Sequence, residues 1–213
     1  MAKVNNDFEN YLEQHTSHED EVLNELARHT YLTTYNPRMI SGIVQGKFLE
    51  LLCKIYQPKR ILEIGTFTGY STICMAKGIG ESSIIDTIEV NDELETTILE
   101  YLQKAHINHK VKLHIGNALE IIPQLSNDYD LIFIDGDKRE YPEYFKLVID
   151  KVKKGGLILA DNVLWGGKVL DSNETDKHTI AVKEFNNMVQ NHPSIQNVLL
   201  PLRDGLMLMY KTE

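Results

Sequence analysis

The stretch RILEIGTFTGYS (residues 60–71) combines a short apolar run, a turn that carries two glycines, and the start of a helix-like pattern. The run over residues 60–65 predicts a buried strand, and the apolar spacing over residues 70–77 predicts a helix. A strand that passes through a tight turn into a helix is the unit from which parallel sheets are built. This stretch therefore indicates an α/β fold.

The same alternation of strand and helix continues along the chain. Four further apolar runs predict strands: SIIDTIEV, KVKLHIG, YDLIFID (residues 129–135) and LILAD (residues 157–161). Helices are expected over residues 92–104, 118–125, 141–152 and 176–190, with Asp92 as the N-cap of the first. The last two apolar runs, VLLPL and LMLMYK, flank Arg203-Asp204-Gly205. An Asp-Gly pair between such runs predicts an antiparallel hairpin.

Residues 1–57 show only helical patterns, over residues 8–14, 19–32 and 43–55. We expect them to cap the carboxyl edge of the sheet, where ligands bind in open α/β sheets. The predicted fold is a Rossmann-like seven-stranded sheet, mostly parallel with a C-terminal antiparallel hairpin, flanked by helices. A single domain is expected over residues 1–213, with a helical cap (1–57) and an α/β core (58–213).

The composition, 42% hydrophobic and 25% charged, is that of a soluble globular protein. The net charge of -9 disfavours binding of nucleic acid through overall electrostatics. No apolar run approaches the ~18 residues of a membrane span, and the polar N-terminus lacks the features of a secretory signal, so a cytoplasmic location is expected. Cys53 and Cys74 have no metal-ligand spacing and are expected to be reduced, buried thiols.

The turn after the first strand and the acids near it indicate a nucleoside-like ligand. Gly65 and Gly69 let the backbone approach a ligand, but the third glycine of the dinucleotide fingerprint is absent. Glu89 follows Gly69 by about 20 residues, where a carboxylate can accept ribose hydroxyls, although helix capping is equally consistent. Glu63, inside the apolar strand, needs donors such as a ligand amine or backbone amides. A ligand with an adenosine-like half and an ammonium-bearing half fits these residues.

Oxygen-bearing side chains end the fourth and fifth predicted strands. Asp135 ends one and Asp161-Asn162 end the other, and neighbouring strand ends lie about 5 Å apart. Two carboxylates and an amide, without His or Cys, favour a hard cation such as Mg²⁺, Mn²⁺ or Ca²⁺ over zinc. The alternative is that each acid caps a helix or a loop. Lys138 is either a proton acceptor in the cleft or a solvated surface lysine.

Six segments, EIGTFTGYS, TIEV, GNALE, FIDGDKREYPEYF, GGLILADNVLW and DGLMLMYK, together resemble the cation-dependent class I O-methyltransferases, the family of catechol and caffeoyl-coenzyme A O-methyltransferases. The resemblance implies S-adenosylmethionine as methyl donor and a divalent cation, with Mg²⁺ placed before Mn²⁺ and Ca²⁺. The residues that it assigns to the cofactor are Ser41, Glu63, Gly65, Thr66, Ser71, Glu89, Ala118 and Asp135. It assigns the cation to Asp135, Asp161 and Asn162, and the catalytic roles to Lys138 and Asp135.

The resemblance also implies the reaction and its acceptor. A catechol-like phenol such as a caffeoyl compound would bind the cation through two vicinal hydroxyls, and Lys138 would take up a proton before the oxyanion attacks the methyl group. Trp165 and Tyr141 are candidates for an apolar wall against the ring, or for core packing alone. Arg38 is a further candidate on the acceptor side. The loop VLDSNETDKHT (169–179) is where acceptor choice is expected to lie, and a homodimer is expected by resemblance only.

Two alternatives remain at this point. Bacterial relatives of the family that methylate a hydroxylated uridine in transfer RNA make RNA a second acceptor class. This requires a basic face near the cleft, for which Lys138-Arg139, residues 151–154 and Arg38 are the candidates. The third possibility is a module that binds the cofactor without turnover, and the intact set of Asp135, Lys138, Asp161 and Asn162 argues against it.

Overall fold

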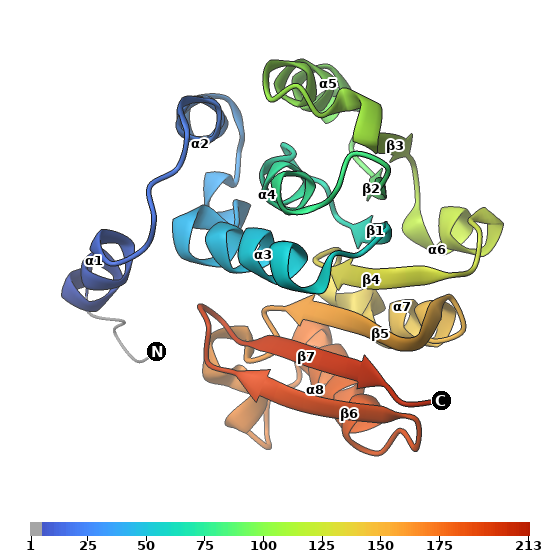
Figure 1. Ribbon diagram of the computed structural model, residues 1–213. Helices are drawn as coiled ribbons and strands as arrows, with labels where there is room; N and C mark the ends of the chain where they lie inside the picture. Colours follow the sequence, from blue (N-terminus) through green and yellow to red (C-terminus); the bar gives the residue numbers. More distant parts are fainter. Residues whose placement is uncertain (1–5) are drawn as a thin grey trace.

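A mixed sheet of seven strands, in the order β3-β2-β1-β4-β5-β7-β6, forms the centre of the computed structural model, which describes residues 6–213 (Figure 1). The strands are β1 (Arg60–Ile64), β2 (Ile84–Glu89), β3 (Val111–Ile115), β4 (Tyr129–Ile134), β5 (Val152–Asp161), β6 (Ile195–Leu200) and β7 (Leu206–Lys211). β1 to β5 pair in parallel, whereas β7 is antiparallel to both β5 and β6. The predicted fold class, including the C-terminal hairpin, is confirmed.

Helices cover both faces of this sheet. They are α1 (Asn6–Gln14), α2 (Glu21–Thr33), α3 (Gly42–Tyr56), α4 (Tyr70–Gly78), α5 (Glu95–Lys104), α6 (Ala118–Ile121), α7 (Tyr141–Val148) and α8 (Lys177–Gln190). Short 3-10 segments span Pro37–Met39, Asp92–Leu94, Asn108–Lys110, Ile122–Gln124, Lys138–Glu140 and Trp165–Leu170. No helix within residues 6–213 is long and apolar enough to span a membrane.

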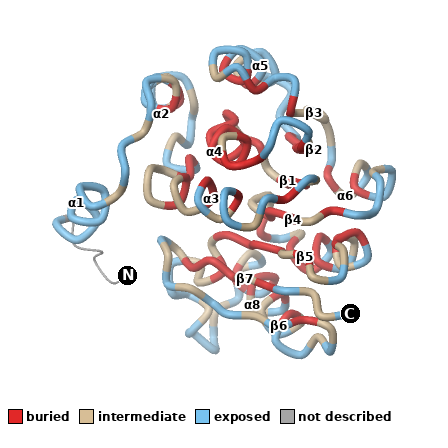
Figure 2. The backbone as a smooth tube through the Cα atoms, in the orientation of Figure 1, coloured by how far each residue is buried: buried red, intermediate tan, exposed pale blue. Residues whose placement is uncertain are grey.

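The strands are apolar on both sides because each face has its own layer of helices. Along β1, Ile61 belongs to the buried cluster that contains Leu49 of α3 and Ile73 of α4, whereas Leu62 belongs to the cluster that contains Phe145 of α7 and Phe185 of α8. Figure 2 shows the buried positions concentrated in α4 and the central strands, while α1 is exposed along its described side chains. Two buried clusters, one on each face, therefore fix the strands that carry the site.

The boundary between α7 and β5 differs from the prediction. α7 ends at Val148 rather than at residue 152, and β5 begins at Val152 rather than at residue 157. Val152 pairs with Tyr129 and Leu157 pairs with Leu131, so the register shifts between these pairs and residues 153–156 form a bulge in β5. A side chain at Gly156 would lie 2.5 Å from the side chain of Val152, so this glycine permits the bulge instead of ending the strand.

The start of α5 and the N-terminal helices also differ from the prediction. Asp92 is not a helix N-cap, because the side chain of Asn91 accepts from the amide of Glu93 and opens a 3-10 turn before α5. α3 lies along a sheet face beside α4 instead of over the carboxyl edge, since its Leu49 and Cys53 are fully buried there. Only the first turn of α3 reaches the edge. Cys53 and the similarly buried Cys74 are free thiols, as predicted.

Candidate functional site

The turn between β1 and α4 passes directly over the end of β4. Gly65 has a φ of +99°, and a side chain there would place its first carbon 2.4 Å from the carbonyl oxygen of Asp135. Gly69 precedes α4 with a φ of +93°. Only glycine combines this conformation with such a close approach. The turn is therefore held beside Asp135, the first residue after β4.

An open cleft lies at this turn. Five of the predicted site residues line it together, namely Ser41, Gly65, Thr66, Ser71 and Asp135. Sequence reasoning missed Met39, Ile40, Phe67 and Tyr70, which complete the lining. The structure thus brings residues of the β1–α4 turn, the segment before α3 and the end of β4 to one cavity.

Glu63 does not line this cleft. Its side chain is fully buried, and its oxygens accept from three hydroxyl groups: Ser71 at 2.5 Å, Thr87 at 2.6 Å, and Thr72. Burial raises the pKa of Glu63 to about 7, although these hydrogen bonds lower it. The expected donors were a ligand amine or backbone amides, and the protein supplies hydroxyls instead. Glu63 acts on the cleft by orienting Ser71, which does line it.

Glu89 and Ala118 lie farther along the same edge and are not part of the cleft lining. Glu89 accepts from the backbone amides of Phe67 at 2.7 Å and Asn91 at 2.9 Å, and burial raises its pKa. Ala118 is the buried first residue of α6. Because Phe67 lines the cleft, Glu89 is connected to the cavity through the turn that it holds.

The two acids predicted to share a cation lie side by side. Ile134 pairs with Ala160 across β4 and β5, so Asp135 and Asp161 are the next residues on adjacent strands. Burial raises the pKa of Asp135 to about 6, with the ammonium of Lys138 lowering it and the charge of Asp161 raising it. Asn162 follows with a left-handed φ of 59°, a conformation that asparagine tolerates better than most residues.

Lys138 is a buried lysine rather than a solvated one. Its Nζ donates to Asp135 Oδ1 at 2.8 Å and to the hydroxyl of Tyr141 at 2.6 Å. Tyr141 is fully buried and its hydroxyl lies 2.9 Å from the carbonyl oxygen of Asp161, to which it donates. Of the two roles expected for Tyr141, acceptor wall or core packing, this position fits core packing, because the side chain ties the ends of β4 and β5 together below the surface.

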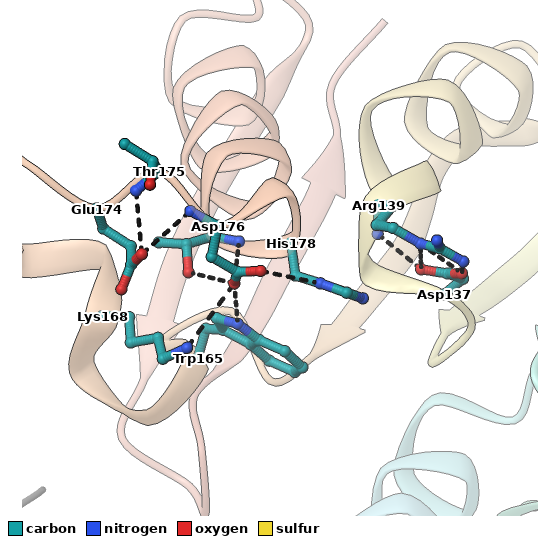
Figure 3. Close-up of polar contacts among 9 residues, drawn as sticks. Asp137, Arg139, Trp165, Lys168, Glu174, Thr175, Asp176 and His178 are labelled. Atoms are coloured by element: carbon teal, nitrogen blue, oxygen red, sulfur yellow. Dashed lines mark hydrogen bonds and ion pairs between the residues drawn. The ribbon is translucent and has the colours of Figure 1, made fainter.

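Trp165 begins the loop that follows β5 and is half-buried. Its indole stacks on the ring of His178 with centroids 5.7 Å apart, and its Nε1 donates to Asp176 Oδ2 at 3.4 Å (Figure 3). Hydrogen bonds from His178 and Thr179 hold the pKa of Asp176 well below its usual range. The N-terminus of α8 therefore anchors the loop, and Trp165 keeps the position of a candidate acceptor wall.

The basic residues weighed for RNA binding do not gather on one face. Lys151 precedes β5 and residues 152–154 begin it, at the opposite end of the strand from Asp161. Arg139 is paired with Asp137 (Figure 3), and Lys138 is buried. Arg38 is exposed next to the cleft-lining Met39. A continuous cationic surface of the kind that binds a phosphate backbone is not formed by these side chains.

Two further residues at the edge were missed by sequence reasoning. Gln45 of α3 donates to Asp161 at 2.8 Å, and Arg203 of the β6–β7 loop donates to Gln45 at 3.2 Å. Arg203 was considered only as part of a turn. Gln45 follows two apolar residues in the segment IVQGKF. A polar side chain on the apolar face of a predicted helix needs a buried hydrogen-bond partner, and this was the one sequence signal for its role.

The donor set at the ends of β4 and β5 fits a hard divalent cation. Asp135 and Asp161 bring two like charges together, and within residues 6–213 the only ion pair to either carboxylate is the one from Lys138. Asn162 adds an amide oxygen on the same strand end. Such a set leaves further coordination positions to water or acceptor oxygens, as Mg²⁺ prefers. In the described part of the chain, no three His, Cys, Asp or Glu side chains form a metal-binding group.

Comparison with known proteins places these features in context. The chain matches the family model described as O-methyltransferase over residues 13–212. It is 37% identical over 162 residues to a catechol O-methyltransferase of Niastella koreensis, covering 74% of this chain and 73% of that protein. It is 35% identical over 202 residues to a caffeoyl-CoA O-methyltransferase of Populus trichocarpa, covering 89% and 81%.

Two solved structures have closely similar folds. The O-methyltransferase from Bacillus cereus in complex with SAH has a TM-score of 0.90 and 28% identity, covering 96% of this chain and 97% of that one. The O-methyltransferase TomG from Streptomyces achromogenes, in complex with SAM, has a TM-score of 0.88 and 30% identity, covering 97% and 96%. The likeness thus extends over nearly the whole chain.

Proposed function

The chain belongs to the O-methyltransferase family, and from that premise we propose that it methylates one of two vicinal hydroxyls of a catechol-like small molecule held at a divalent cation. Similar structures with bound SAM and SAH make the protein an S-adenosylmethionine-dependent O-methyltransferase. The cation and the acceptor are the proposed part. The observation that carries it is the position of Asp135, which both lines the cleft and lies beside Asp161.

The methyl donor is proposed to occupy the cleft at the β1–α4 turn. Ser41, Thr66 and Ser71 present polar groups there, and the hydroxyl of Ser71 is oriented by the buried Glu63. Gly65 lets the donor approach the backbone without meeting a side chain. A donor in this cleft lies next to Asp135, so methyl transfer would take place at the border between the cleft and the acidic strand ends.

Asp135, Asp161 and Asn162 are proposed to hold the cation. When bound, a divalent cation lowers the pKa of a coordinated hydroxyl and so favours the oxyanion that attacks the methyl group. Lys138 is the proposed base for the acceptor hydroxyl, and Asp135 and Tyr141 fix the place of its Nζ. Correct positioning of the acceptor oxygen against the methyl group supplies much of the rate.

The loop after β5 is proposed to form the acceptor side. Trp165 offers a flat apolar surface, and its indole is already ordered by His178 and Asp176. Relatives named for catechol and for caffeoyl-CoA support an aromatic diol as acceptor. No described side-chain arrangement favours RNA, so we do not propose it.

Methyl transfer from labelled S-adenosylmethionine tests this function. Acceptors are caffeic acid, simple catechols, the matching monophenols, and transfer RNA with and without hydroxyuridine, each with and without a chelator. We expect the diols alone to be methylated and the chelator to abolish the reaction. Activity on RNA alone would overturn the acceptor, and equal activity on monophenols or in chelator would overturn the role of the cation.

A further inference from the structure

A buried amide supports the carboxylate of Asp161 from the side of α3. Gln45 is fully buried, and its Nε2 donates to Asp161 Oδ2 at 2.8 Å. On its other side, Gln45 Oε1 accepts from Arg203 Nη1 at 3.2 Å. The second oxygen of Asp161 accepts from the backbone amide of Asn162 at 2.7 Å. A chain of hydrogen bonds therefore runs from the β6–β7 loop to the carboxyl edge of the sheet.

The chemistry of its neighbours fixes the orientation of the Gln45 amide. A carboxylate only accepts hydrogen bonds, and a guanidinium only donates them. An amide between the two satisfies both in one orientation, with nitrogen toward Asp161 and oxygen toward Arg203. Because Gln45 is fully buried, water cannot replace either bond. The amide thus sets the direction in which the free lone pairs of Asp161 point.

Arg203 connects this amide to both sides of the site. Its Nη1 also donates to the carbonyl oxygen of Ser41, which lines the cleft. The next residue, Asp204, accepts from the amide of Gly166 at 2.7 Å through its side chain and from the amide of Leu164 at 2.9 Å through its carbonyl oxygen. One hairpin loop therefore holds the segment before α3 and the loop that carries the acceptor wall.

We infer that Gln45, supported by Arg203, is a positioning residue for the divalent cation. By holding one carboxylate oxygen, Gln45 sets the rotation of Asp161 and the direction of its bond to the cation. The inference rests on the proposed function, because it assumes that Asp161 is a metal ligand. Outer partners of metal ligands typically change metal affinity by about 10–100-fold when they are removed.

Manganese binding tests the inference without turnover. The full-length protein is titrated with Mn²⁺, and the free ion is followed by its electron paramagnetic resonance signal. The variant Gln45→Met keeps the length of the side chain and removes both hydrogen bonds. We expect its Mn²⁺ dissociation constant to rise by about 10–100-fold. Arg203→Met keeps the side-chain amide of Gln45 but removes the hydrogen bond that holds its oxygen. We expect the Mn²⁺ dissociation constant of this variant to rise by only about fivefold.

Gln57, at the other end of α3, provides the matched control. Its side-chain amide donates to the carbonyl oxygens of Lys54 and Gly78 and has no contact with the acidic strand ends. Gln57→Met should lower the thermal unfolding temperature and leave Mn²⁺ affinity within about twofold of wild type, because α3 still presents Gln45. Loss of helix stability is thereby separated from loss of metal positioning.

A double variant distinguishes a relay from two independent effects. If Arg203 acts on the cation through Gln45, then Gln45→Met combined with Arg203→Met binds Mn²⁺ as weakly as Gln45→Met alone. Additive losses would overturn the relay. If Asp161→Ala loses Mn²⁺ binding but Gln45→Met binds Mn²⁺ as tightly as wild type, the inference about Gln45 is overturned.

Equal Mn²⁺ affinity in wild type and Asp161→Ala would instead remove the proposed metal site and the inference with it. If Gln45→Met does not fold, Arg203→Met alone decides, and unchanged Mn²⁺ affinity in that variant overturns the relay.

Discussion

The acids at the carboxyl ends of β1 and β2 differ from those at the ends of β4 and β5 in which groups lie beside their oxygens. Glu63 accepts from three hydroxyl groups, and Glu89 accepts from two backbone amides. Among residues 6–213, the side chain of Asp135 accepts from Lys138 alone, and that of Asp161 accepts from Gln45 and from the amide of Asn162. The latter two carboxylates also lie beside each other.

This difference separates acids that build a cavity from acids that can bind an ion. Oxygens that already receive protein donors stabilise the turn and the hydroxyls around the cleft, which is a structural task. Asp135 and Asp161 are adjacent like charges that repel each other, so a cation between them stabilises both. The same residue type thus serves two purposes along one sheet edge.

Removal of one acid from the β4–β5 pair should have the largest effect. Asp161→Ala is expected to lower kcat for catechol methylation by about 1,000-fold, because a Lewis acid contributes several kcal/mol to such a reaction. Binding of S-adenosylhomocysteine, measured by calorimetry, should be nearly unchanged, since Asp161 does not line the cleft. If Asp161→Ala fails to fold, or if it keeps its kcat, the assignment of an ion-binding role to the β4–β5 acids and a structural role to the β1–β2 acids would be contradicted.

In the β1–β2 pair, Glu63→Gln should change stability with pH. The folded protein keeps the Glu63 proton up to a pKa of about 7, whereas the unfolded chain releases it near 4.5, so the wild-type free energy of unfolding falls as pH rises through this window. Glutamine does not titrate. From about pH 4 to about pH 8 the variant should gain about 3 kcal/mol relative to wild type. Chemical denaturation at several pH values measures the free energy of unfolding of both proteins. A difference between them that does not change with pH would contradict a buried Glu63 carboxyl with a raised pKa.

Substitution of two equally buried lysines compares the carboxyl ends of the strands, where the acids lie, with the amino ends. Lys138 and Lys151 are each 7% exposed, but Lys151 precedes β5 and donates to the carbonyl oxygen of Leu125 at 2.7 Å, away from the acids. Lys138→Met should lower kcat by about 100-fold through loss of a proton acceptor. Lys151→Met should change stability and leave kcat close to wild type. Steady-state kinetics that show similar losses in both variants would argue for a structural role of Lys138.

The smallest effect is expected in the loop after β5. Trp165→Ala should raise the KM for the catechol by about fivefold and change kcat little, because an aromatic contact contributes about 1 kcal/mol. Tyr210→Ala, on β7 opposite Leu157 and far from the acidic strand ends, is the matched aromatic control. Equal KM values for wild type and Trp165→Ala would remove Trp165 from the acceptor wall.

Local sequence patterns were sufficient for the strands and for their acidic ends. YDLIFID and LILAD are apolar runs that stop at acids, and parallel strands present those ends at one edge, so the pairing of Asp135 with Asp161 followed from order alone. The bulge in β5 did not follow, because lysines and paired glycines in KVKKGG are also typical of loops.

Partners distant in sequence were beyond prediction. Asp161 and Gln45 are separated by 116 positions, and the hydroxyl of Thr87 that reaches Glu63 lies on another strand. For Tyr141 the sequence leaves two roles open, acceptor wall or core packing, because an aromatic at the start of a helix packs inward or outward according to the helix position over the sheet. Burial of that kind is decided by tertiary packing, which no local pattern encodes.

Metal removal, with both halves of the site followed in one sample, tests the central claim most directly. The chelated, metal-free enzyme is assayed for transfer to a catechol and titrated with S-adenosylhomocysteine, and Mg²⁺ is then restored. We predict that methyl transfer falls by at least about 100-fold and returns with Mg²⁺, while cofactor affinity changes by less than about threefold. Undiminished transfer in the metal-free enzyme would contradict a cation at the ends of β4 and β5.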